Sequence, residues 1–129
     1  MNPKPYIISF NEDIGLLHIR YIGNLTIEDI GTSFKEAKQN LPLPKDLLVI
    51  SNFLEANTKI KYTELHKLIR PTLNVIRSHK SIFDAIITDK PKGMVFTTLF
   101  KEFIKKKNVH YKIFSTIEAA QEWLMSTKI

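Results

Sequence analysis

The first candidates for metal or acid–base chemistry in this sequence are its four histidines: His18, His66, His79 and His110. No two of them stand three or four residues apart, so no turn of helix would bring two imidazoles to one face in the way that helical zinc sites require. Cysteine is absent, which excludes thiolate ligands, disulfides and a cysteine nucleophile. The sequence therefore predicts no metal site and no cofactor.

Motifs for nucleophilic or phosphoryl chemistry are missing as well. The chain has no nucleophile elbow, no P-loop and no Gly-x-Gly-x-x-Gly, and it holds four glycines in all. Two acidic pairs, Glu12–Asp13 and Glu28–Asp29, fall where a turn and a first helical turn are expected, and capping explains them there. We predict no catalytic residues and a chain that is not an enzyme. Catalytic side chains that converge only in the folded chain are the alternative.

Lysine makes the chain basic. Lys and Arg together number 19 against 13 Asp and Glu, for a formal net charge of +6. Such an excess favours acidic partners, namely an acidic protein, an anionic lipid or a nucleic acid. Most of the cations are lysines, whereas proteins that read bases rely on the arginine fork, so we expect no nucleic-acid partner. A solvated surface without a specific partner is the plain alternative.

Two groups of basic residues could form a binding surface. Lys90 and Lys92 precede a predicted helix start at Gly93, where helix amides and two ammonium groups would make a weak anion site; a tight surface turn is the alternative. A denser cluster lies at the end of the same helix and runs into the last strand: Lys101, Lys105, Lys106, Lys107 and Lys112. Lysines complement the dipole at a helix C-terminus, which is a structural reason for them. The functional interpretation is a docking surface for anionic lipid head groups or an acidic partner.

Hydrophobic patterns predict the elements that carry these residues. Residues 6–10 and 16–22 are β-prone runs joined by turn-forming residues, which predicts a hairpin. Thr26 and Asp29 form a capping-box pattern that predicts the start of the first helix. The unbroken apolar run at 47–50 is typical of a parallel strand that is covered on both faces.

The next segments combine a loop and two helices. A polar loop is expected at Asn52–Lys61, followed by a helix that starts near Thr63 and is kinked or broken at Pro71. The third helix, from Gly93 onward, is expected to turn one apolar face toward the sheet. That face holds Val95, Phe96, Leu99, Phe100, Phe103 and Ile104.

Strands at 83–88 and 109–114, with a last helix capped by a Ser115–Glu118 box, complete the order β-β-α-β-α-β-α-β-α. The predicted fold class is α/β, with a single domain over residues 1–129 and a mixed sheet of about five strands covered by helices. No apolar run is long enough to span a membrane, and no signal peptide is evident. Together with the absence of cysteine, this favours a cytoplasmic protein.

This order of elements and several short stretches resemble the STAS-like domains, in particular the SpoIIAA-like branch of the STAS/SEC14 family. The stretches are FDAIITD at 83–89, LFKEF at 99–103, YKIFS at 111–115 and EAAQEWL at 118–124. In that branch a strand is followed by a helix with a Leu-Phe pair, a strand that ends in Phe, and a final helix reading Glu-Ala-x-x-Trp-Leu. Packing residues carry the resemblance, so it implies the fold more than the function.

The resemblance implies a protein-binding role. Anti-sigma-factor antagonists of this family bind a partner protein and are switched by phosphorylation of a Ser or Thr in an Asp-Ser-Ser-Gly-like motif at a helix start. Here that motif is degraded, and the hydroxyls near the corresponding place are those of Thr58 and Thr63. We predict a non-enzymatic regulatory module that acts by protein–protein interaction, with these two threonines as candidate regulatory hydroxyls. Their structural alternative is a loop threonine and an N-cap.

A rival hypothesis comes from the same resemblance. Related domains are thought to accommodate lipids, so a small apolar, lipidic or anionic ligand held between the sheet and the helices is the alternative function. A homodimer is compatible with either function. A site of any kind is expected at the carboxyl ends of the parallel strands, in Asn52–Lys61 and Asp89–Gly93, where open α/β sheets bind their ligands.

Overall fold

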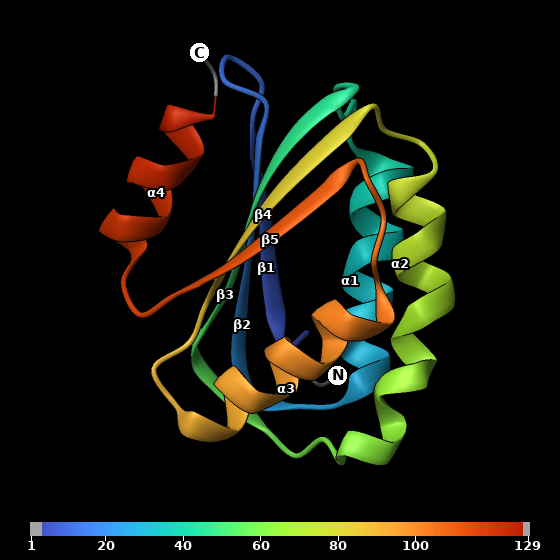
Figure 1. The fold of residues 1–129 in the computed structure, drawn as a ribbon, viewed down its shortest axis with the longest axis vertical. Coiled ribbons are helices and arrows are strands. Elements are labelled where there is room, and N and C mark those ends of the chain that lie inside the picture. Colours follow the sequence, from blue (N-terminus) through green and yellow to red (C-terminus); the bar gives the residue numbers. More distant parts are fainter. Residues whose placement is uncertain (1–3, 128–129) are drawn as a thin grey trace.

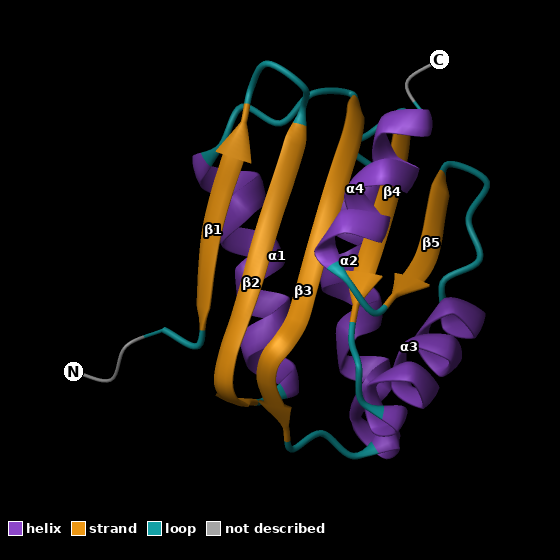
Figure 2. Cartoon of the chain, turned by 90° about the vertical axis from the view of Figure 1, so that its left-hand side faces the viewer, coloured by secondary structure: helices purple, strands orange, loops and turns teal. Residues whose placement is uncertain are grey.

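Five strands form one mixed sheet, in the order β1-β2-β3-β4-β5, in the computed structural model of the chain, which describes residues 4–127 (Figures 1 and 2). β1 and β2 pair antiparallel as the predicted hairpin, and every later pair of neighbours is parallel. The strands are β1 (Tyr6–Asn11), β2 (Leu16–Leu25), β3 (Asp46–Thr58), β4 (Ser81–Ile87) and β5 (Val109–Phe114). The predicted α/β fold with a mixed sheet is confirmed.

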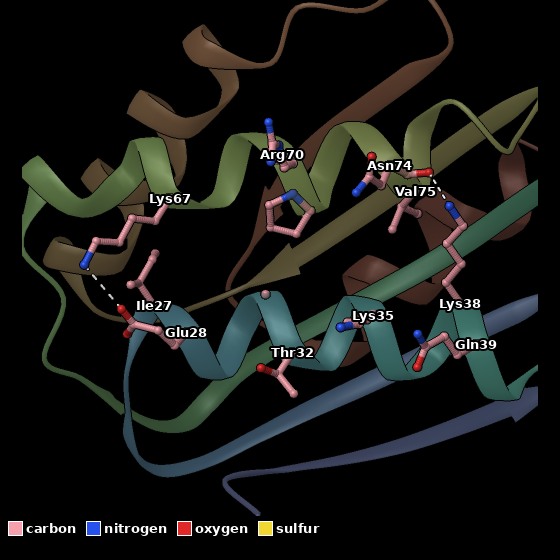
Figure 3. A pocket seen from close by; sticks show the side chains of 12 residues that line it. Ile27, Glu28, Thr32, Lys35, Lys38, Gln39, Lys67, Arg70, Asn74 and Val75 are labelled. Carbon is pink, nitrogen blue, oxygen red and sulfur yellow. Dashed lines mark hydrogen bonds and ion pairs between the residues drawn. The ribbon is translucent and has the colours of Figure 1, made fainter.

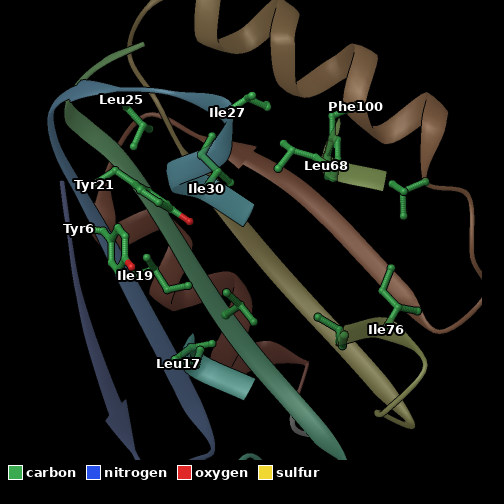
Figure 4. Close-up of a cluster of buried hydrophobic side chains, with 14 of the residues drawn as sticks. Tyr6, Leu17, Ile19, Tyr21, Leu25, Ile27, Ile30, Leu68, Ile76 and Phe100 are labelled. Carbon is green, nitrogen blue, oxygen red and sulfur yellow. The ribbon is translucent and has the colours of Figure 1, made fainter. Parts of the chain in front are cut away.

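Helices cover the two faces of this sheet unequally (Figure 1). One face carries three α-helices and a 3-10 helix, η1, and the other carries α4 alone. The helices are α1 (Ile27–Asn40), η1 (Tyr62–Leu68), α2 (Ile69–Ile76), α3 (Pro91–Phe103) and α4 (Ile117–Ser126). The larger hydrophobic core lies on the three-helix face, where Figure 4 shows Ile19, Tyr21 and Phe100 among its members.

The first helix begins as its capping pattern predicts. The Asp29 amide donates to Thr26 Oγ1 at 3.2 Å, and the Thr26 amide donates to Asp29 Oδ2 at 2.9 Å. The predicted box at Ser115 is wrong by one residue, because α4 is capped by Thr116, whose hydroxyl accepts from the Ala119 amide at 3.2 Å. Two hydroxyl residues in succession left the sequence pattern unable to choose between them.

The loop predicted at Asn52–Lys61 is wrong, because β3 continues through most of it to Thr58. β2 runs to Leu25, and after a bulge its end pairs with this part of β3, up to Leu25 opposite Thr58. Cross-strand pairing therefore orders residues that are too polar to be recognised as a strand.

The helical segment around Pro71 changes type upstream of the proline. The segment starts as 3-10 helix and becomes α-helix at Ile69, so Pro71 lies in the first turn of α2. Proline is tolerated there, because the first amides of an α-helix have no partner within the helix. The predicted kink or break at Pro71 is therefore wrong, because α2 continues through this residue to Ile76 and the change of helix type lies upstream of it.

Trp123 on α4 ties this helix to the sheet. Its ring lies 5.9 Å from the Phe83 ring and 5.6 Å from the Phe114 ring, centroid to centroid. The side chain is partly buried.

We expect Trp123→Ala to lower the free energy of unfolding by about 2 kcal/mol, below the ~3–5 kcal/mol of a fully buried aromatic, because part of the indole is in water. Urea unfolding followed by circular dichroism measures this. Met125→Ala on the exposed side of α4 should stay within about 0.5 kcal/mol of wild type. Equal effects of the two substitutions would show that the indole does not anchor α4.

Candidate docking surface

The carboxyl ends of β3 and β4 bring together several residues that the sequence singled out. β4 ends at Ile87, which pairs with Asn52, so the rest of β3 has no strand beside it on that edge. Backbone carbonyls of this part of β3 accept hydrogen bonds from lysine ammonium groups instead. Lys90 Nζ donates to the carbonyls of Leu54 and Ala56 at 3.3 and 3.2 Å, and Lys92 Nζ donates to that of Thr58 at 3.3 Å. Both cations thus fasten the start of α3 to the bare edge of β3.

Gly93 lies in the first turn of α3, where the helix presses on the end of β4. A Cβ added at this position would overlap Thr88 Oγ1 and lie 3.2 Å from Thr88 Cβ. The same hydroxyl accepts from the Lys90 amide at 3.4 Å. The packing of α3 on β4 therefore explains the glycine, independently of any bound anion.

The two candidate hydroxyls occupy different surroundings. Thr58 is half-buried at the end of β3, and Thr63 is exposed within η1. The expectation that Thr63 is an N-cap is wrong, since Lys61 holds that position and its amide donates to Glu64 Oε1 at 3.0 Å. The carboxylate of Glu64 satisfies the helix start, which leaves the Thr63 side chain outside the cap.

The outer face of α3 exposes a row of large apolar side chains. Val95, Leu99 and Phe103 follow one another at i, i+4 and i+8, and they are 48%, 38% and 55% exposed. Met94, also exposed, lies beside them. We call these four residues the α3 stripe. Within residues 4–127 seven large hydrophobic side chains are exposed, and the stripe supplies four of them, with Tyr62 of neighbouring η1 a fifth.

The α3 stripe corrects the expectation that all the apolar residues of this helix face the sheet. Thr97 and Phe100 in the helix and Ile104 directly after it are buried instead. The expected face of six side chains is too wide for one helix to bury, because such a helix presents only part of its circumference to a sheet. The remaining apolar side chains of α3 therefore face water.

Lysines surround the carboxyl end of α3. Lys101, Lys105, Lys106 and Lys107 line an open hollow there, beside Val109 and Tyr111. Lys105 is held by Glu102 at 2.8 Å, and this pairing lowers the pKa of the Glu102 carboxyl and raises that of the Lys105 ammonium. The exposed apolar stripe thus ends in a positively charged region.

The sequence patterns did not single out Asp84, which is a buried carboxyl. Asp84 lies in the middle of β4, only 8% exposed, and Ser51 Oγ donates to its Oδ1 at 3.0 Å. Burial raises the pKa of this carboxyl to about 7, and the hydrogen bond from Ser51 opposes the shift. The available signal was a single carboxylate inside the apolar run at 82–87.

Asp84 and Thr72 line the same small cavity, of about 40 Å³, between the sheet and the helices. Thr72 Oγ1 is buried and has no hydrogen-bond partner among the described residues. In residues 4–127 no three His, Cys, Asp or Glu side chains gather closely enough to hold a metal ion. None of the helices in that range is long and apolar enough to cross a membrane.

Comparisons with known proteins place this architecture. No protein-family model matches the chain, and no curated protein matches it significantly. Among solved structures, it resembles an uncharacterized protein of the DUF3478 family, with a SpoIIAA-like fold, from Shewanella loihica PV-4. The TM-score is 0.61 at 19% identity, over 92% of this chain and 91% of the other. The fold is SpoIIAA-like. The resemblance inferred from residues 83–124 is thereby confirmed at the level of the SpoIIAA-like fold, without a function attached.

Proposed function

We propose that this chain is a non-enzymatic regulatory module that binds a protein partner through α3. The observation that carries the proposal is the α3 stripe. Scattered exposed apolar residues are ordinary, but a contiguous row on one helix marks interaction surfaces in proteins. Phe103, more than half exposed, is the kind of aromatic side chain that anchors an interface.

The surroundings of the stripe indicate the chemistry of the partner. Lys105, Lys106 and Lys107 follow the helix directly, so the matching surface should offer an apolar groove with carboxylates where α3 ends. Pairing of two copies of this chain through α3 is disfavoured, because each copy carries a net charge of +6. The partner is therefore an acidic protein rather than a second copy.

A photoreactive amino acid placed at Leu99 should cross-link this partner in a lysate of the source cells. The same probe at Met125, which is similarly exposed on α4 (41% against 38%), should leave that partner uncaptured. The cross-linked protein is identified by mass spectrometry, expressed, purified and mixed with the chain. An adduct that forms equally from both positions, or one that is only lipid or a second copy of the chain, would contradict the proposal.

An enclosed ligand is the second candidate function. Asp84 favours it, as does the Thr72 hydroxyl beside the same cavity, which has no hydrogen-bond partner within residues 4–127. The cavities between sheet and helices measure about 30–40 Å³ each, against ~300–1,000 Å³ for ordinary ligand sites. A lipid would therefore enter only if the covering helices moved outward. Native mass spectrometry of the purified protein tests this function, since a carried ligand adds its own mass to that of the chain.

A further inference from the structure

A long groove runs between α1 and the η1–α2 segment (Figure 3). It encloses about 680 Å³. A contact between the two helices closes each end. Lys67 Nζ lies 3.3 Å from Glu28 Oε1 at one end, and Lys38 Nζ donates to the carbonyl of Asn74 at 2.8 Å at the other. Figure 3 draws both contacts, with the space between them open to the viewer.

The floor of the groove is apolar and shallow. A Cβ added at Gly31 would lie at an ordinary 3.5 Å from Pro71 Cγ, which shows that α1 and α2 pass close to each other here. Ile27 and Val75 also line the space. An apolar surface therefore runs along the bottom, between two polar walls.

The walls carry four cations and one carboxylate. Lys35 and Lys38 come from α1, and Lys67 and Arg70 come from the opposite wall. Within each pair the residues stand three apart, which is close to one helical turn of ~5.4 Å. Lys67 is engaged by Glu28, the single carboxylate of the lining, and by Glu64 at 3.5 Å, whereas Lys35 and Arg70 make no ion pair within the described part of the chain. The groove thus keeps an excess of positive charge, repeated at helical spacing on both sides.

We infer that this groove is the docking site for an acidic amphipathic helix of a partner protein. Carboxylates one turn apart on such a helix would meet the cations of both walls, and its apolar side would lie over Gly31 and Pro71. The open side of the groove would leave a small molecule largely in water, so a longer segment fits better. Three of the four cations are lysines, which favours carboxylates over a nucleic acid read by arginine forks. This site is separate from the α3 stripe and does not depend on it.

The probe is a designed fluorescein-labelled peptide of about 20 residues, long enough to form helix. Its glutamates recur every three or four positions on one side, and alanine and leucine fill the other. Fluorescence anisotropy should show binding that weakens as salt is raised. Charge reversal in the double variant Lys35→Glu, Arg70→Glu should weaken it by at least about tenfold. The matched control, Lys45→Glu with Lys80→Glu, makes the same change in net charge at exposed sites outside the groove and should bind as wild type.

A second peptide with the same composition, but with its glutamates spread around the helix, should bind more weakly than the first. The inference is overturned if the two peptides bind equally, or if the control variant loses as much affinity as the groove variant. Equally tight binding of a DNA duplex, lost in the same groove variant, would also overturn it, by showing a general attraction for polyanions. Leu99→Glu should leave peptide binding unchanged, which separates this site from the α3 stripe.

Discussion

Raising the pH from about 4 to about 8 should lower the free energy of unfolding by about 4 kcal/mol through Asp84 alone, at ~1.36 kcal/mol per pKa unit. In the folded chain burial raises the pKa of this carboxyl from 3.8 to about 7. Below the lower value the carboxyl is protonated in both states. Between the two values the folded protein keeps its proton while the unfolded chain has lost it, so stability falls as the pH rises and levels off above about 7.

The residues packed around Asp84 do not titrate with it between about pH 4 and pH 8. Ser51 donates to it, and the neighbouring Tyr21 and Tyr111 have phenol pKa values raised by burial, so both stay neutral. The half-buried His18 and His79 have pKa values lowered by burial. Their contribution has the opposite sign, because the unfolded chain protonates them more readily as the pH falls.

Asp84→Asn isolates the carboxyl, since the amide keeps an oxygen acceptor for Ser51 and cannot ionise. Urea unfolding of wild type and variant should be compared from about pH 4 to pH 8. The difference in stability should shift by about 4 kcal/mol in favour of the variant as the pH rises, while the histidine contributions cancel. A difference that stays constant with pH would mean that Asp84 ionises in the folded protein as it does in water.

Gly93→Val should lower the free energy of unfolding by about 3 kcal/mol, the upper part of the range for overpacking. The added Cβ would overlap the Thr88 hydroxyl, and Thr88 is itself buried directly after β4. The first turn of α3 would have to lift away from the sheet, and Lys90 and Lys92 would lose their carbonyl partners on β3.

Two comparisons test this explanation of Gly93. Thr88→Ala removes Oγ1 and Cγ2, including the atom that the new Cβ would overlap, and should restore at least half of the loss in the double variant. Gly31→Ala places its Cβ at an ordinary 3.5 Å from Pro71, and it should be neutral or stabilising by up to about 1 kcal/mol, because alanine favours helix. If Gly31→Ala destabilised as much as Gly93→Val, close packing at Thr88 would not be the cause.

Sequence patterns were enough to predict the elements that depend only on residues close together in the chain. The Thr26–Asp29 cap and the hairpin at 6–22 follow from neighbouring residues, and the structure has both. The extension of β3 to Thr58 could not be foreseen, because it depends on a partner strand some thirty residues away and not on its own hydrophobicity.

The two proposed binding surfaces likewise combine features that neighbouring residues determine with features that depend on residues far apart in the sequence. In α3 the apolar residues surround most of the helix, so periodicity alone does not decide whether Phe100 or Phe103 faces the sheet. Packing on Tyr111 decides it, because the Phe100 and Tyr111 rings lie 5.7 Å apart. The α1–α2 groove is formed by residues such as Lys35 and Arg70, which only the fold brings to one place. The lysines of 105–107 were visible as a cluster because they are adjacent in the chain.

The most direct test of the proposed function is isothermal titration calorimetry. The partner that cross-linking identifies, expressed and purified without the cross-link, is titrated into three forms of this chain. The forms are wild type, the double variant Leu99→Glu, Phe103→Glu, and the control Met125→Glu. Two carboxylates on the α3 stripe should weaken binding by at least about a hundredfold, since a buried interface tolerates unpaired charge poorly. The control should bind as wild type. Full affinity in the stripe variant, with its fold intact by circular dichroism, would contradict docking through α3.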